Sequence, residues 1–120
     1  MGASQFQPVV SYDLQATFTG SSTTSTMVDL RGNVLRGVFL PSGFTGTTLR
    51  LQAATDSDET YLDVEDGSGS NVTLTASGAS KFVPLPTAHR DAVDGLRFVK
   101  MISGSTQTTT NIVTLAVRPI

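Results

Sequence analysis

Apolar and polar residues alternate with a period of two along most of the chain. The pattern is clearest in TLRLQA (48–53), NVTLTA (71–76) and NIVTLAVRP (111–119). Because successive side chains of a strand point to opposite faces, this period predicts β-strands with one buried face. β-Branched residues fill the same segments and favour a pleated, half-buried surface.

Runs of Gly, Ser, Thr, Asn and Asp separate these segments and predict turns. The clearest is DGSGSN (66–71), whose Asp-Gly start is typical of a hairpin connection. The stretch PTAHRDAVDG (86–95) is the one helix candidate, and Gly95 limits it to one or two turns. We expect eight or nine strands, at about residues 9–18, 26–31, 33–40, 47–54, 59–65, 71–76, 80–84, 96–103 and 111–118.

Short strands at this spacing predict an all-β fold, an antiparallel β-sandwich or jelly roll. A chain of 120 residues has the size of one domain, which we assign to residues 9–120. The segment GLRFVKMIS (95–103) is apolar on both faces, which predicts a central strand. We expect the core to come from Leu49, Leu51, Val72, Leu74, Phe98, Val113, Leu115 and Val117.

Residues 1–8, MGASQFQP, predict an N-terminal arm that precedes the sandwich. Pro8 lacks the N–H that a central strand needs. Phe6 and Val9 are apolar and have no place in the alternating core, so a neighbouring subunit is their expected cover. An extended arm of this length reaches up to about 28 Å. We therefore expect Phe6, Pro8 and Val9 to make protein–protein contacts.

Composition narrows the range of partners. The net charge is −2 and the eight Lys and Arg residues are spread singly, so no basic block can neutralise nucleic-acid phosphates. No apolar run approaches the length of a membrane span, and the first residues lack the pattern of a secretory signal. The chain has no cysteine, which excludes disulfides and thiolate-ligated zinc. We expect neither nucleic acid nor membrane as a partner.

The acidic residues are concentrated in one segment, which holds Asp56, Asp58, Glu59, Asp63, Glu65 and Asp66. Such a segment can solvate a strand, bind calcium or supply catalytic carboxylates. The EF-hand pattern is not matched, because Thr60 and Tyr61 stand where further ligands and the glycine would be needed. In a strand, Asp63 and Glu65 would share the face opposite Leu62 and Val64, which favours a solvated face over an apolar underside. We expect no metal and no cofactor.

His89 is the single histidine and lies near Asp91 and Asp94. A catalytic triad or a metal site needs more supporting groups than this stretch offers, so we expect a surface or capping role for His89. No serine lies in a Gly-x-Ser-x-Gly elbow, and the glycine-rich stretches lack the lysine of a phosphate loop. These patterns predict that the protein is not an enzyme.

A series of short motifs follows in a fixed order through residues 33–118. It consists of an apolar strand, Pro41, Phe-Thr-Gly (44–46), Leu-x-x-Gln (49–52), an Asp-rich turn (56–58) before Tyr61, and Leu-Arg-Phe-x-Lys (96–100). This order resembles a group of small virion proteins of tailed bacteriophages. The same architecture is similar to galactose-binding-like jelly rolls that bind sugars. One departure lies at Asp58-Glu59-Thr60, where the phage pattern usually has Asp-Gly before the aromatic residue.

The resemblance implies a jelly-roll subunit on a phage head, a decoration or cement protein that stabilises the shell of the major capsid protein. It also implies a homo-oligomer, often a trimer, on the capsid surface of the virion after synthesis in the host cytoplasm. The alternative is a carbohydrate-binding jelly-roll module of a tail or head fibre. Sugar sites usually carry aromatic platforms, and the chain has no Trp and two Tyr, so we favour the structural role.

Overall fold

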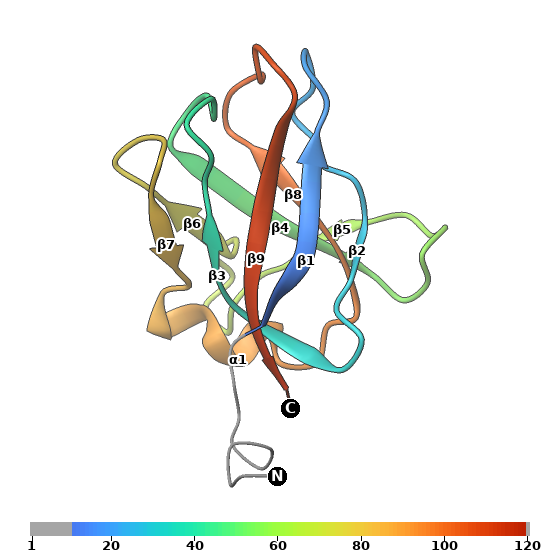
Figure 1. Ribbon diagram of the computed structural model, residues 1–120. Helices are drawn as coiled ribbons and strands as arrows, with labels where there is room; N and C mark the ends of the chain where they lie inside the picture. The colour runs from blue at the N-terminus through green and yellow to red at the C-terminus, as the bar shows by residue number, and fades with distance from the viewer. Residues whose placement is uncertain (1–10, 120) are drawn as a thin grey trace, which may run out of the picture.

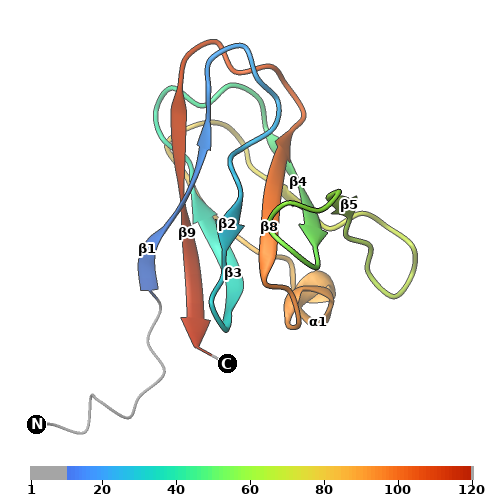
Figure 2. The same cartoon turned by 90° about the vertical axis from the view of Figure 1, so that its right-hand side faces the viewer.

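The computed structural model describes residues 11–119, which form two antiparallel β-sheets packed face to face (Figure 1 and Figure 2). The strands are β1 (Ser11–Phe18), β2 (Val28–Asp29), β3 (Asn33–Phe39), β4 (Thr48–Ala54), β5 (Leu62–Asp63), β6 (Thr73–Thr75), β7 (Phe82–Pro84), β8 (Phe98–Ser103) and β9 (Asn111–Pro119). Between β7 and β8 lie a 3₁₀ turn, η2 (Thr87–His89), and a four-residue helix, α1 (Arg90–Val93). The predicted all-β sandwich and its one short helical segment are confirmed.

The strand order is that of one long antiparallel ribbon that has been rolled up. β1 pairs with β9, β2 with β8, β3 with β7 and β4 with β6, so the two halves of the chain run side by side. Pairing of β3 with β9 and of β4 with β8 then closes the roll into sheets of order β1-β9-β3-β7 and β2-β8-β4-β5. This is the double-sheet arrangement of a jelly roll.

The turn at residues 66–70 forms the tip of this ribbon. Glu65 bridges to Asn71, and the N–H of Asp66 donates to the carbonyl of Ser70 at 2.8 Å. Gly69 has a φ of 85°, in the left-handed region that glycine enters without steric cost. The hairpin connection predicted for this segment is confirmed.

The core lies between the two sheets. The predicted core residues other than Phe98 are at most 2% exposed, namely Leu49, Leu51, Val72, Leu74, Val113, Leu115 and Val117. Phe18 is fully buried and meets Phe44 edge to face, with 5.9 Å between the ring centres. The two-residue period therefore identified the inward faces of most strands correctly.

The prediction that Phe98 belongs to the core is wrong. In β8 the buried positions include Val99 and Met101, whereas Phe98 points outward and is half-buried. The guanidinium of Arg97 lies 4.7 Å from the centre of the Phe98 ring. This segment is apolar on both faces, so its period could not identify the inward one. The register decides it, because Met101 lies opposite Leu51 of β4, whose side chain faces the core.

A buried polar network closes the sandwich at the end where β4 begins and β8 ends. Gln107 is fully buried, and its Oε1 accepts hydrogen bonds from the N–H of Thr45 and from Nδ2 of Asn111, both at 2.9 Å. Its Nε2 donates to the carbonyl of Thr45 at 2.8 Å and to Oγ of Ser103 at 2.9 Å. Asn111 Nδ2 also donates to the carbonyl of Gly43 at 3.0 Å. These bonds offset the cost of burying the two amides.

Candidate functional site

The six acidic side chains of residues 56–66 do not converge on one point. They are spread over the loop after β4, the edge strand β5 and the turn at residues 66–70. Within residues 11–119, no group of three or more acidic or histidine side chains is placed to hold a metal ion. Each carboxylate therefore has surroundings of its own.

Asp63 joins a polar ladder on the outer face of its sheet. Its Oδ1 accepts hydrogen bonds from Nε of Arg50 at 2.9 Å and from Nε2 of Gln52 at 3.0 Å. The bond from Gln52, followed by that from Arg50, lowers the pKa of the Asp63 carboxyl. The predicted solvated strand face is confirmed for this residue, and an ion pair so open to water adds little to stability.

Asp66 organises the turn at residues 66–70. Its Oδ1 accepts hydrogen bonds from the hydroxyl of Ser68 at 2.7 Å, from the N–H of Ser68 at 2.8 Å and from the N–H of Ser70 at 3.1 Å. The bond from the Ser68 hydroxyl is the largest cause of a lowered pKa for Asp66. Its other oxygen, Oδ2, lies 3.2 Å from Nδ1 of His89, without the alignment of a hydrogen bond.

His89 occupies the N-cap position of α1, as a capping role requires, but its side chain does not make the capping hydrogen bond. Its side chain is only 15% exposed, and no side chain makes a capping hydrogen bond at the start of η2 or α1. Instead, the imidazole faces the Asp66 carboxylate and joins the tip of the ribbon to the helical segment. Sequence patterns could not show this contact, because Asp66 and His89 meet only after the ribbon has rolled up.

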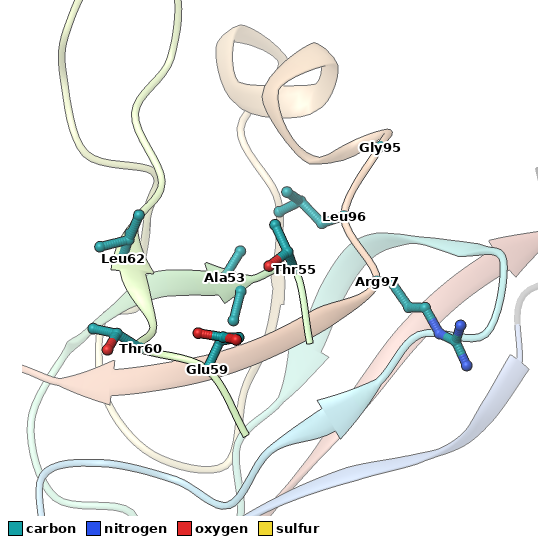
Figure 3. Close-up of a pocket in the computed structure, with 9 residues that line it drawn as sticks. Ala53, Thr55, Glu59, Thr60, Leu62, Gly95, Leu96 and Arg97 are labelled. Atoms are coloured by element: carbon teal, nitrogen blue, oxygen red, sulfur yellow. The ribbon is translucent and has the colours of Figure 1, made fainter. Parts of the chain in front are cut away.

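A hollow of about 620 Å³ opens at the end of the sandwich opposite Gln107, where β4 ends and β8 begins (Figure 3). Its lining consists of Ala53, Ala54, Thr55, Glu59, Thr60, Leu62, Gly95, Leu96 and Arg97. Figure 3 shows Ala53, Leu62 and Leu96 around the same space, with Thr60 and Glu59 beside them. Two chain segments that are distant in sequence therefore enclose a largely apolar surface.

The expectation that Leu62 shares an apolar underside with Val64 is wrong for Leu62. Val64 is 9% exposed, whereas Leu62 is 67% exposed. The physical reason is the shortness of β5, which has two residues and lies at the edge of its sheet. Leu62 pairs with Ala53 of β4 and forms a wall of the hollow. A large exposed apolar side chain beside further apolar groups is typical of a surface that binds a partner.

The loop between β4 and β5, which we call the rim because it borders the hollow, carries three acidic residues. Asp56, Asp58 and Glu59 are exposed on the loop between β4 and β5, and Glu59 lines the hollow directly. Arg97 also belongs to the lining, but Figure 3 shows its guanidinium pointing away from the other side chains. It binds both carboxylate oxygens of Asp29, at 3.1 and 3.2 Å, and this pairing lowers the pKa of Asp29. Arg97 also interacts with Asp56 of the acidic loop.

Tyr61 braces the acidic loop against the sheet. Its hydroxyl donates to the carbonyl of Ser57 at 3.0 Å, and Nζ of Lys100 lies 4.4 Å from the centre of its ring. Burial raises the pKa of Tyr61, and the carboxylates of Asp58 and Asp56 raise it further. The loop is therefore held against the sheet, next to the cation of Lys100 as well as its own carboxylates.

A second apolar surface lies on the outer face of the β1-β9-β3-β7 sheet. Phe39, Phe82 and Ile112 are 38%, 47% and 48% exposed. Phe39 lies opposite Phe82, with 4.7 Å between ring centres, and opposite Thr114, the next residue after Ile112 on that face. A Cβ at Gly37 would lie 2.6 Å from Cζ of Phe82, so the ring needs glycine there. We call Phe39, Phe82 and Ile112 the outer patch; alternation alone did not predict it.

Phe6, Pro8 and Val9, the predicted contact residues, lie outside the described residues, so their role stays a prediction. Within residues 11–119, no helix has the length and apolar character that crossing a membrane requires. Comparisons with protein-family models, with curated proteins and with solved structures found no match.

Proposed function

We propose that the protein is a non-enzymatic bacteriophage virion protein that decorates the capsid and stabilises its shell of major capsid protein. The observation that carries the proposal is the outer patch. Adjacent exposed apolar side chains on one sheet face are typical of a surface that is buried against another protein. The order of motifs that resembles small phage virion proteins supports the same function.

The geometry of the outer patch suits a protein contact. Phe82 and Ile112 keep nearly half of their surface open to water, and covering apolar area is favourable by about 25 cal/mol per Å². The Phe82 ring rests over Gly37 and against the Phe39 ring. Because the ring is already held in place, little side-chain entropy is lost when a partner covers it.

The proposed assembly is a homotrimer on the capsid surface. In this arrangement the outer patch faces the shell, and the N-terminal segments, with Phe6, Pro8 and Val9, contact neighbouring subunits. Such a protein acts by adding buried area between shell subunits and needs no cofactor.

Binding to phage particles tests the function. Particles released by the strain whose genome encodes the chain are stripped of the protein, mixed with purified chain and sedimented. We expect saturable binding, with a copy number comparable to that of the shell subunits. Phe82→Ser should weaken this binding about tenfold or more, because an exposed ring at the contact is lost.

Phe98→Ser is the matched control, because it removes a half-buried ring from the outer face of the other sheet. It should bind particles as the wild-type chain does, once both proteins are shown to be folded. Absence of the chain from the particles would overturn the proposal. A copy number of a fibre component, together with glycan binding, would instead favour the carbohydrate-binding alternative.

A further inference from the structure

We propose that the hollow between β4, β5 and the segment before β8 receives an apolar side chain from an extended polypeptide that carries Lys or Arg beside it. Under the proposed function, that polypeptide belongs to the major capsid protein. The hollow and the chemistry of its ligand do not depend on that function. The hollow would then be a second contact, distinct from the outer patch on the other sheet.

The floor of the hollow selects an apolar group. Leu62, Leu96 and Ala53 border it, and Leu62 keeps 67% of its surface exposed. A volume of about 620 Å³ is large enough for a long aliphatic or aromatic side chain with its adjoining backbone. Filling it removes the apolar surface of both molecules from water, which is the main favourable term in such binding.

The rim selects positive charge next to that apolar group. Glu59 lines the hollow, and Asp56 and Asp58 are exposed on the same loop. The raised pKa of Tyr61 is caused in part by Asp58 and Asp56, so their field extends over this loop. Arg97 pairs with Asp29 through two hydrogen bonds and also interacts with Asp56, so it offsets only part of the negative charge of this loop. Complementary charge of this kind favours a basic segment and disfavours an acidic one.

The sheet edge beside the hollow favours an extended chain over a compact ligand. β5 ends the strand order of its sheet, so an incoming segment can lie along it. Alternation along an extended segment would turn one side chain inward and leave the neighbouring Lys or Arg near the acidic loop.

Titration with short peptides, followed by NMR of the ¹⁵N-labelled chain, tests the inference without any phage particle. The probe is the capped pentapeptide Gly-Lys-Leu-Arg-Gly, and the controls are Gly-Glu-Leu-Glu-Gly and Gly-Lys-Ser-Arg-Gly. We expect the probe to shift the amide signals of Thr60, Leu62 and Leu96, with a Kd of about 1 mM that rises with salt. Each control peptide should bind about tenfold more weakly.

Two variants of the chain separate the floor from the rim. Leu62→Ser should weaken binding of the probe about tenfold, whereas Ile112→Ser, which changes an exposed aliphatic residue of the outer patch, should leave it unchanged. Replacing the rim charges, as Asp56→Asn, Asp58→Asn and Glu59→Gln together, should remove most of the salt dependence.

Equal shifts with the acidic peptide, or shifts that avoid the hollow, would overturn the inference. Unchanged binding of the probe by Leu62→Ser would do the same. These results are independent of the particle assay, which judges the proposed function. If the wild-type chain fails to bind particles while the probe still binds at the hollow, the capsid function is wrong and the site for a basic, apolar segment stands.

Discussion

The two ends of the β4–β8 strand pair are closed in different ways. At one end, where Leu49 lies opposite Ser103, the buried amide of Gln107 fills the space between the loops. At the other end, where Ala54 lies opposite Phe98, the hollow stays open beside Leu62. The same two strands form both ends, so the difference comes from the connections and not from the pairing.

This difference separates the part of the molecule that holds the fold from the part that presents a surface. A satisfied network of buried amides permits essentially one arrangement of the loops around it. The open end has an exposed leucine and an acidic loop, which gain little from folding alone and can gain more from a partner. We expect substitutions at the closed end to cost stability, and substitutions of the side chains that line the hollow to cost binding of a basic, apolar peptide.

The largest expected contrast is between two phenylalanines at opposite ends. Phe18 pairs with Asn111 at the closed end, is fully buried and packs on Phe44, so Phe18→Ala should cost about 3–5 kcal/mol of unfolding free energy. Phe98 is half-buried at the open end, and Phe98→Ala should cost only about 1 kcal/mol. Urea unfolding followed by circular dichroism measures both.

Equal losses of unfolding free energy in the two alanine variants would contradict this difference between the two ends. Phe18→Leu serves as a milder substitution should Phe18→Ala prove too unstable to purify, and it should still cost more than Phe98→Leu. A larger cost at Phe98 would mean that the outer face of this sheet is covered in the free protein.

Gln107 gives the next largest effect. Gln107→Leu keeps a similar volume but removes the acceptor of the Thr45 N–H and of Asn111 Nδ2, so it should cost roughly 2–3 kcal/mol. Gln52→Leu is the matched control, because Gln52 makes one exposed hydrogen bond to Asp63 and should change stability by less than about 0.5 kcal/mol. The same unfolding assay applies, and equal costs would show that the buried network does not hold the closed end.

The sequence predicted the strands and most of the core because a two-residue period is a local signal. It failed where that signal was ambiguous or short. The segment around Phe98 is apolar on both faces, and only its pairing with β4 fixes which face is buried. Leu62 fits an alternating pattern, but a strand of two residues at a sheet edge leaves it uncovered.

The candidate site was beyond sequence reasoning for a different reason. The hollow combines residues 53–62 with residues 95–97, and the Gln107 network joins two loops that are far apart along the chain. Nothing local distinguishes Gln107 from other polar residues of its loop. The solvated strand face that the sequence predicted is present at Asp63, whereas the contact of Asp66 with His89 depends on the rolled ribbon.

The smallest expected effect is a loss of folding stability at low pH that arises away from the closed end. The pKa values of Asp29, Asp63 and Asp66 are lowered in the folded chain, chiefly by hydrogen bonds from Arg97, Gln52 and Ser68 respectively. The unfolded chain takes up these protons near an ordinary pKa of about 4, while the folded chain takes them up at lower pH. The unfolded state therefore binds more protons in this window, so stability present above about pH 4 is lost as the pH falls through the folded values.

The closed end should escape this loss, because the side chains that form the Gln107 network are amides and hydroxyls. We expect the melting temperature to fall between about pH 5 and pH 2, and Asp29→Asn should make this fall shallower. In NMR spectra over the same range, the amide signal of Leu96 should weaken before that of Gln107. Simultaneous loss of both signals would show that the two ends unfold as one unit. The closed and open ends would then differ in binding but not in stability.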